Sequence, residues 1–169
     1  PAAGEMQLSV LDVGQGLAVV VRTARHSLLY DAGPRFSDEA DSGNRIILPY
    51  LRGAGIAGLD GMIISHDDND HAGGAKSVIE ASPPGWQISS LAPGHALRAA
   101  VPESHACRAG QSWNWDGVRF TILHPDMDAA ASADRGDNDR SCVLMIATEH
   151  GSVLLPGDIG AIVERGLVH

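Results

Sequence analysis

The sequence is poor in aromatic residues and contains no long apolar run. Aromatic side chains make up only 4% of the chain, and no stretch approaches the roughly 20 apolar residues that a membrane-spanning helix needs. The N-terminus also lacks the basic flank and apolar segment of a secretory signal. These absences predict a soluble chain. It begins at Pro1 rather than at Met, which is consistent with a piece excised from a longer protein.

Basic residues are also scarce. The chain carries 12 Lys and Arg against 21 Asp and Glu, a net charge of −9. This balance argues against a broad nucleic-acid surface, because phosphate binding normally needs clustered basic residues. The objection is weaker if bound cations offset part of the negative charge. Seven acids lie in or near the segments interpreted below as surrounding metal: Asp60, Asp67, Asp68, Asp70, Asp137, Asp139 and Asp158.

Only two cysteines are present, Cys107 and Cys142. They lie far apart without CxxC spacing, so the sequence suggests neither a zinc knuckle nor a disulfide framework. Cys142 stands in an apolar run and is expected in the core, whereas Cys107 is expected in the core or at the start of a strand. The cysteines therefore do not indicate whether the protein works in an oxidising or a reducing compartment.

What the chain does contain is typical of a globular protein with many turns: 44% apolar residues, 20% charged residues, 20 Gly and 9 Pro. The length predicts one domain over residues 1–169. Apolar and β-branched runs predict strands over 6–13, 18–23, 27–30, 61–65, 87–91, 118–123, 143–148 and 153–155. Helices are expected over 44–55, 75–81 and 159–168, the first of them started or kinked by Pro49. This mixture favours an α/β layered sandwich.

Residues capable of chemistry concentrate directly after the apolar strand at 61–65. The segment SHDDNDHAGG, residues 65–74, places two imidazoles and three carboxylates within six positions. Carboxylates this close repel one another unless divalent cations turn the repulsion into coordination. A solvated acidic loop is the alternative for such a segment taken alone, so the spacing of the side chains matters more than their number.

That spacing resembles the signature of the metallo-β-lactamase superfamily. The pattern His66-x-Asp68-x-Asp70-His71 matches H-x-H-x-D-H, with Asp68 in place of the second His. The resemblance implies the metallo-β-lactamase fold, an αββα sandwich, and a site for two divalent metal ions. It also implies hydrolysis by metal-activated water.

Two further acids agree with this resemblance. Asp31, in the segment YDAG, stands where the superfamily has a supporting Asp after an early strand. Asp158, in LLPGD, stands where the superfamily has the Asp that bridges two metals, although a helix N-cap is the alternative role for an Asp at that position. The resemblance implies that Asp31 orients the ligands from behind.

Within the superfamily, the chain is most similar to the C-terminal domain of the ComEC competence proteins, the inner-membrane channels for DNA uptake. The similarity lies in LDVGQG at 11–16, LPYLR at 48–52 with the Gly-Ile pair at 55–56, SHDDNDHAGG at 65–74 and the N-x-x-S pattern that begins at Asn138. Two departures stand out. Leu17 replaces a usual Asp, and Pro156 replaces a usual Thr or Ser.

Two histidines of the superfamily have no counterpart in this sequence. One follows the bridging Asp by some tens of residues, but the chain stops at His169, whose context does not match. We therefore expect the second half of the fold to be truncated, with weak metal binding and no cleavage by this segment alone and a His-rich turn beyond it. The other histidine would fall near 137–139, where Asn138 is the candidate for an oxygen ligand or a substrate contact.

The resemblance implies a division of the ligands between two ions. His66 and Asp68 would hold one ion, and Asp70 and His71 would hold the other. Asp158 would bridge them, and Asp68 and Asp70 are the expected catalytic residues. Because carboxylates replace imidazoles, we expect a preference for manganese, with zinc or magnesium as alternatives.

By resemblance, the expected function is a nuclease that degrades the DNA strand that is not imported during natural transformation. The expected partners are DNA, the remainder of a membrane channel in the same chain and other competence proteins. The domain would be a soluble part of a bacterial inner-membrane protein, on its extracytoplasmic side. Two alternatives remain open: a stand-alone phosphodiesterase or small-molecule hydrolase, and a catalytically degenerate domain that guides DNA.

Three other residues attract notice. His124 ends an expected strand before a proline and is kept as a reserve candidate for the site, while the other isolated histidines are expected to make ordinary surface contacts. Trp113 and Trp115 alternate along the chain and are expected to pack on one side of a strand. A base-stacking platform is the alternative for the two tryptophans.

Overall fold

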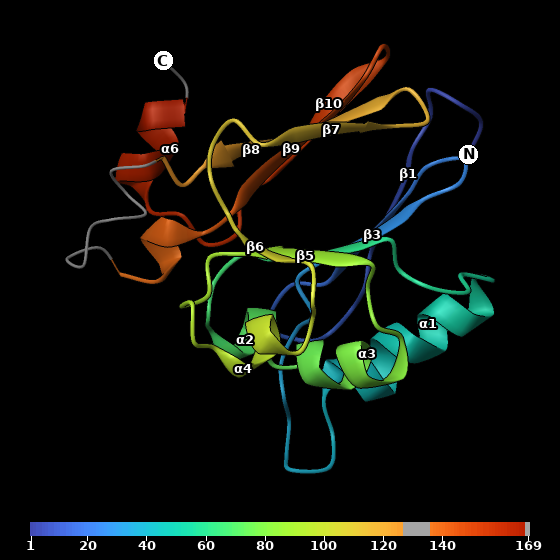
Figure 1. The fold of residues 1–169 in the computed structure, drawn as a ribbon, viewed down its shortest axis with the longest axis vertical. Helices are drawn as coiled ribbons and strands as arrows, with labels where there is room; N and C mark the ends of the chain where they lie inside the picture. Colours follow the sequence, from blue (N-terminus) through green and yellow to red (C-terminus); the bar gives the residue numbers. More distant parts are fainter. Residues whose placement is uncertain (127–135, 168–169) are drawn as a thin grey trace.

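The structure is a computed structural model that describes residues 1–126 and 136–167. Its first sheet has six strands in the order β1-β2-β3-β4-β5-β6 (Figure 1). Strands β1 to β3 pair antiparallel, and β3 to β6 pair parallel. The bounds are β1 (Gln7–Val10), β2 (Val19–Arg22), β3 (Ser27–Tyr30), β4 (Gly61–Ile64), β5 (Trp86–Ser89) and β6 (Ser104–Ala106).

A second sheet of four antiparallel strands packs on the first, in the order β10-β9-β8-β7. The turn between β7 and β8 has positive φ at both central residues, 52° at Asp116 and 88° at Gly117, as two-residue hairpin turns require. The bounds are β7 (Ser112–Trp115), β8 (Val118–His124), β9 (Val143–Thr148) and β10 (Gly151–Leu155).

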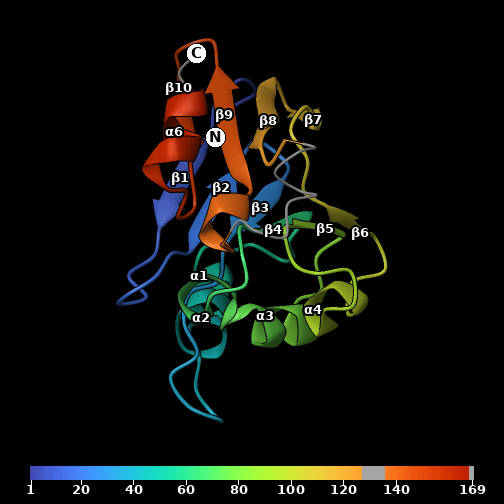
Figure 2. The same cartoon turned by 90° about the vertical axis from the view of Figure 1, so that its left-hand side faces the viewer.

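Helices cover the face of the first sheet that is turned away from the second (Figures 1 and 2). They fill the crossovers that parallel strands need. A π-helical turn η1 (Gly43–Ile47) leads into α1 (Leu48–Gly53), and α2 (Asn69–Ala72), α3 (Ala75–Ala81) and α4 (Ala96–Ala99) follow. The 3-10 turn η2 (Asn138–Arg140) precedes β9, and α6 (Ala161–Leu167) lies at the end of the second sheet. No helix among the described residues is long and apolar enough to cross a bilayer.

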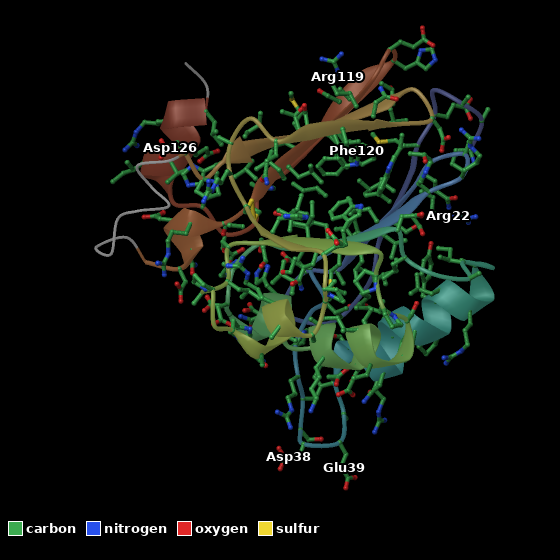
Figure 3. The ribbon with its side chains drawn as sticks, viewed as in Figure 1. Arg22, Asp38, Glu39, Arg119, Phe120 and Asp126 are labelled. Atoms are coloured by element: carbon green, nitrogen blue, oxygen red, sulfur yellow. A yellow bond between two sulfur atoms is a disulfide. The ribbon has the colours of Figure 1, made fainter. Side chains whose placement is uncertain are left out.

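Side chains alternate between two cores, one on each side of the first sheet. Met62 and Ile64 of β4 pack against the helices, whereas Ile63 points to the second sheet, and the whole strand is buried. Burial on both faces is what an uninterrupted apolar run predicts for a central strand. On β8, Phe120 points inward between the sheets and its neighbour Arg119 points outward (Figure 3).

The predicted α/β sandwich is confirmed, with differences at particular elements. The helix expected at 44–55 is present, but it begins as the π-helical turn η1, which continues directly into α1 with Pro49 in its first turn. The supposed loop at 66–71 ends in the helical turn α2. The helix expected from 159 begins at Ala161, and the predicted end of that helix at Val168 lies outside the described residues. Strand β6 and helix α4 were not predicted at all.

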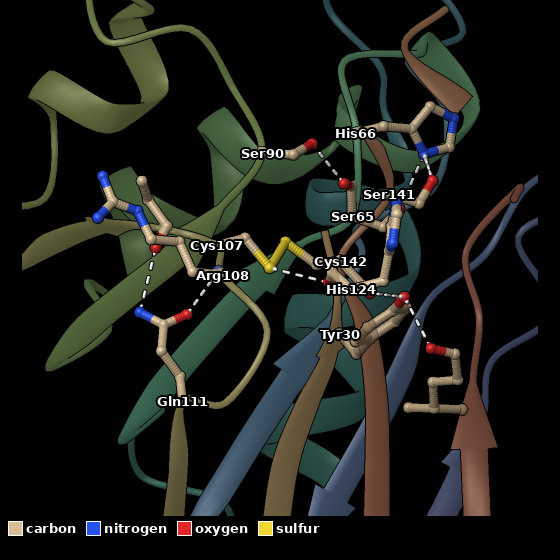
Figure 4. Close-up of a disulfide and its surroundings, with 12 residues drawn as sticks. Tyr30, Ser65, His66, Ser90, Cys107, Arg108, Gln111, His124, Ser141 and Cys142 are labelled. Atoms are coloured by element: carbon tan, nitrogen blue, oxygen red, sulfur yellow. Dashed lines mark hydrogen bonds between the residues drawn. A yellow bond between two sulfur atoms is a disulfide. The ribbon is translucent and has the colours of Figure 1, made fainter. Parts of the chain in front are cut away.

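The structure contains a disulfide that the sequence did not suggest. Cys107 and Cys142 are both buried, as expected, but they are bonded to each other (Figure 4). Cys107 directly follows β6 of the first sheet, and Cys142 directly precedes β9 of the second. Their Cα atoms are 5.9 Å apart, inside the usual range for a disulfide. A separation of 35 residues in sequence gave no hint of this, because only the packing of the two sheets brings the two strand ends together.

The tryptophans pack, as expected. Trp113 stacks on Phe120 with ring centroids 5.1 Å apart, and Trp86 meets Trp113 edge-on at 5.2 Å. Trp115 joins the same group, which lies against the core between the sheets. These rings serve the core rather than forming an open stacking platform.

Candidate metal centre

The candidate site lies where strands of both sheets end. Residues 65–68 directly follow β4, and Asp31 directly follows β3. The carboxyl ends of parallel strands meet at one edge of a sheet, which is the usual place for a binding site in such folds. Asp158 comes from the other sheet, three residues after β10. The packing of the two sheets therefore assembles the site from segments far apart in sequence.

Three side chains converge as a metal-binding cluster. One ligand atom each from His66, His71 and Asp158 can be chosen so that all three lie within 4.8 Å of one another. His71 Nε2 lies 3.2 Å from Asp158 Oδ1, and the two imidazole centroids are 4.2 Å apart. Both histidines are buried, whereas the Asp158 side chain is 45% exposed. Solvent therefore reaches the cluster from the side of Asp158 and is excluded from the side of the two histidines.

The buried nitrogen of His66 indicates that a cation fits this cluster. His66 Nδ1 lies 2.9 Å from Ser65 Oγ and 3.3 Å from Ser141 Oγ. Among the described residues, its Nε2 is buried and makes no hydrogen bond, although Asp68 Oδ2 is 3.3 Å away. A buried polar atom without a partner costs about 1–3 kcal/mol. Two imidazoles and a carboxylate are donors that divalent transition metals accept, so a bound cation would remove that cost.

Asp31 holds the cluster in place from behind. Its φ of 55° is left-handed, a conformation that Asp tolerates better than most residues. The fully buried carboxylate accepts from the Ser65 backbone N–H at 2.7 Å, and its Oδ2 lies 2.7 Å from both Ser65 Oγ and His71 Nδ1. A proton on Nδ1 is thereby directed to Asp31, which leaves the Nε2 lone pair of His71 facing Asp158.

The electrostatics of His71 follow from these neighbours. Burial lowers the pKa of His71, but the hydrogen bond that its ring donates to Asp31 and the charges of Asp31, Asp158 and Asp70 together raise this pKa above its ordinary value. The carboxylates therefore favour a positive charge at the imidazole. A proton and a metal cation compete for that position.

Three other predicted site residues are not among the three side chains of this cluster. Asp68 stands just before α2, and its side chain is 47% exposed. Asp70 lies in the first turn of α2, and its backbone carbonyl accepts from Leu17 N–H at 3.0 Å. Asn138 begins η2 and is exposed. Within the described residues, the side chain of Asn138 makes no hydrogen bond to the cluster, and the roles predicted for all three remain predictions.

Sequence reasoning gave no role to two serines that the structure places in the site. Ser65 contacts Asp31 and both histidines, and Ser141 contacts His66. Ser141 Oγ also accepts from the backbone N–H of Asp158 at 3.3 Å. A signal was present, because Ser65 begins the metal-binding motif and Ser141 ends the N-x-x-S pattern.

Glycine at 157 permits the close approach of Asp158 to this wall. Gly157 has a φ of 60°, and a Cβ at that position would meet Ser141 Cβ at 2.8 Å and Ser65 Cβ at 3.0 Å. Only glycine accommodates both the left-handed backbone and the contact.

The reserve candidate His124 has a different use, because its Nε2 lies 2.8 Å from the Asp139 carbonyl. His169 lies outside the described residues.

Comparisons with known proteins agree with this geometry. A sequence model of the metallo-β-lactamase superfamily matches residues 11–169. The chain is 39% identical over 161 residues to Recombination protein 2 of Haemophilus influenzae, which covers 94% of this chain and 19% of that protein. It is 36% identical over 168 residues to Competence protein ComA of Neisseria gonorrhoeae, which covers 97% of this chain and 21% of that protein. The chain thus spans about a fifth of the length of these relatives.

A solved structure supports the fold alone. A mutant metallo-β-lactamase from Cronobacter sakazakii superposes with a TM-score of 0.59 and 17% identity, over 86% of this chain and 59% of that one. The similarity to ComEC competence proteins is confirmed by relatives that cover nearly the whole chain. The superfamily match, the shared fold and the histidine and aspartate cluster converge on one assignment. The chain belongs to the metallo-β-lactamase superfamily.

Proposed function

We propose that this chain is the metal-dependent phosphodiesterase domain of a DNA-uptake protein and that it degrades the DNA strand that is not imported. The observation that carries the proposal is the buried, unpartnered His66 Nε2 beside His71 and Asp158, as judged over the described residues. Membership of the superfamily supports metal-dependent hydrolysis. The names of the relatives, a recombination protein and a competence protein, support nucleic acid as the substrate.

In this proposal His66, His71 and Asp158 hold divalent cations, and Asp68 and Asp70 complete the ligand set. When bound, such ions lower the pKa of water and neutralise negative charge that develops on a phosphodiester. Oxygen ligands in place of imidazoles favour manganese over zinc, with magnesium as a further possibility.

The residues of the chain divide the remaining tasks. Asp31 keeps the proton of His71 on Nδ1, so that Nε2 stays available as a ligand. Ser141 joins the two walls of the site through His66 and the backbone of Asp158. Asp68, half exposed beside His66, is proposed to accept the proton that the attacking water would lose. Asn138 is proposed to contact the substrate from η2.

The proposed location is the extracytoplasmic side of the inner membrane, as part of a membrane channel. The Cys107–Cys142 disulfide supports this side, because disulfides persist in oxidising compartments and are rare in the bacterial cytosol. DNA, the rest of the channel and other competence proteins are the proposed partners.

The test is cleavage of labelled single-stranded and double-stranded DNA with manganese, magnesium or zinc. In the full-length protein we expect manganese-dependent cleavage that His66→Gln and Asp158→Asn abolish. His150→Gln removes an exposed histidine at a distant turn and should cleave like the unchanged protein. Hydrolysis of bis(p-nitrophenyl) phosphate without cleavage of DNA would favour a small-molecule phosphodiesterase. DNA binding without any hydrolysis would favour a guiding domain.

A further inference from the structure

A pocket of about 490 Å³ opens beside the metal centre, and three arginines line it. Arg98 comes from α4, Arg108 follows β6, and Arg140 ends η2. The floor is formed by Ser89 and Ser90 at the end of β5. The pocket thus lies at the same edge of the first sheet as the metal-binding loop.

The pocket concentrates positive charge in an acidic protein. Three of the chain's 12 basic residues line it. Of its two carboxylates, Asp137 pairs with the pocket's own Arg140, which leaves the charges of Arg98 and Arg108, and Asp67 lies 3.2 Å from His95 Nε2. Within the described residues, the Arg98 guanidinium donates one hydrogen bond, to the Leu91 carbonyl at 3.1 Å.

The guanidinium of Arg108 is similarly available. The residue is exposed, and within residues 1–126 and 136–167 no salt bridge of its side chain is found. Its backbone N–H is held by Gln111 at 2.8 Å, which fixes the segment that carries it (Figure 4). The pocket therefore offers positive charge that no carboxylate of the described residues neutralises.

Two buried polar atoms at this pocket also lack partners. Ser89 is fully buried, and its hydroxyl makes no hydrogen bond within the described residues. The Nε atom of Arg140 is also buried without a hydrogen-bond partner within the described residues, because the contact with Asp137 is made by Nη2. Unpartnered buried polar groups call for an explanation, and an unseen ligand is one of the usual ones. Hydroxyl and guanidinium donors together match the several acceptor oxygens of a phosphate.

Residues that line the pocket contact, or are adjacent in sequence to, residues of the metal centre. Ser90 Oγ donates to the carbonyl of Ser65 at 2.5 Å, directly before His66. Arg140 directly precedes Ser141, whose hydroxyl lies 3.3 Å from His66 Nδ1. Asp67, between two predicted ligands, lines the pocket as well. A group bound there would be a neighbour of a substrate bound at the metals.

We propose that this arginine pocket binds a backbone phosphate of a nucleic-acid strand, adjacent to the phosphodiester held at the metal centre. The inference rests on the proposed function and adds a substrate contact to it. The volume is within the range of about 300–1,000 Å³ of small-ligand sites, which suits part of a single strand and is too small for a duplex. No aromatic residue of the described part of the chain lines the pocket, so we expect it to hold the strand by its backbone and without base preference.

The test measures binding of a fluorescein-labelled oligothymidylate by anisotropy, in EDTA, at several salt concentrations. The double variant Arg98→Ala/Arg108→Ala removes two pocket charges. Its matched control, Arg45→Ala/Arg119→Ala, removes two exposed arginines that line none of the pockets found in the described residues. We expect the pocket variant to bind about tenfold more weakly, with a salt slope reduced by about 0.7 for each lost phosphate contact. The control should bind like the unchanged protein.

Equal affinity of the two double variants, or an unchanged salt slope in the pocket variant, would overturn the proposal. Thermal melting of both variants identifies any general loss of folding, and Arg98→Lys/Arg108→Lys, which keeps both charges, should restore most of the binding. The outcome is separable from that of the proposed function. Arginine-dependent binding without cleavage would retain the pocket and reject the nuclease. Cleavage that depends on His66 but not on these arginines would retain the nuclease and reject the pocket.

Discussion

Replacement of Asp31 by Asn tests whether this buried carboxylate orients the metal ligands. The asparagine has the same shape and tolerates the left-handed backbone at this position. Its Oδ1 can still accept from the Ser65 N–H, and its Nδ2 can donate to Ser65 Oγ and to His71 Nδ1. Donation to Nδ1 moves the histidine proton to Nε2, so the nitrogen that faces Asp158 can no longer coordinate a cation.

The expected effects differ in size between folding and metal binding. Three hydrogen bonds to a carboxylate, each 2.7 Å long, become bonds to a neutral amide. Charge-assisted bonds contribute about 1.5–3 kcal/mol each against roughly 1 for neutral ones, and the smaller desolvation of the amide offsets part of the difference. We expect a loss of about 1–3 kcal/mol, which lowers the Tm in EDTA by roughly 3–10 °C. Manganese affinity should fall further, by about 10–100-fold, because the tautomer is wrong.

The assays are thermal melting in EDTA and calorimetric titration with manganese. Asp38→Asn is the matched control, since Asp38 is fully exposed and, within the described residues, forms an ion pair with Arg35 alone. The control should change neither quantity. Unchanged manganese affinity in Asp31→Asn, with the expected fall in Tm, would refute the orienting role while leaving the structural one.

Three other predictions concern the disulfide, a turn and the metal preference. Reduction of Cys107–Cys142, which closes a loop of 35 residues, should destabilise the fold by about 4 kcal/mol in the chain-entropy estimate; an unchanged melting curve in reducing agent would contradict it. A hydrogen bond from Thr23, with further contacts from His26 and Arg25, holds the pKa of Asp116 well below its usual range. Asp116→Asn should therefore lower the Tm at pH 7, and the difference should narrow as the pH falls below about 4, where the unfolded carboxyl protonates; a difference independent of pH would argue against the assignment. Asp68→His should shift the metal preference of cleavage from manganese toward zinc, and cleavage by the unchanged protein with zinc alone would count against the premise.

The parts of the fold that the sequence predicted are those controlled by local pattern. Strand β4 was predictable because its apolar run has no polar interruption, as burial on both faces requires. Helix α3 was predictable because glycines precede it and prolines follow it. The short strand β6 and helix α4 have too few residues for a periodic signal, and their neighbours in space stabilise them.

The candidate site shows the same division. The spacing of His66 and His71 is local, so the sequence could indicate a metal-binding segment. Contact between His71 and Asp158 depends on how the second sheet packs on the first, and only the resemblance to a family linked the two residues beforehand. The disulfide and the arginine pocket had no such link, because their members lie on segments that no motif connects.

The distribution of charge bears on how an acidic protein could hold DNA. The −9 balance argues against nucleic acid only if the acids stand where the strand would bind. Around the cluster, the carboxylates of Asp68, Asp70 and Asp158 repel a phosphate until cations neutralise them, whereas the arginine pocket attracts a phosphate without metal. The DNA strand is therefore expected to bind first in the arginine pocket. It reaches the catalytic position only when metal is bound, so strand binding at that position and metal binding should strengthen each other.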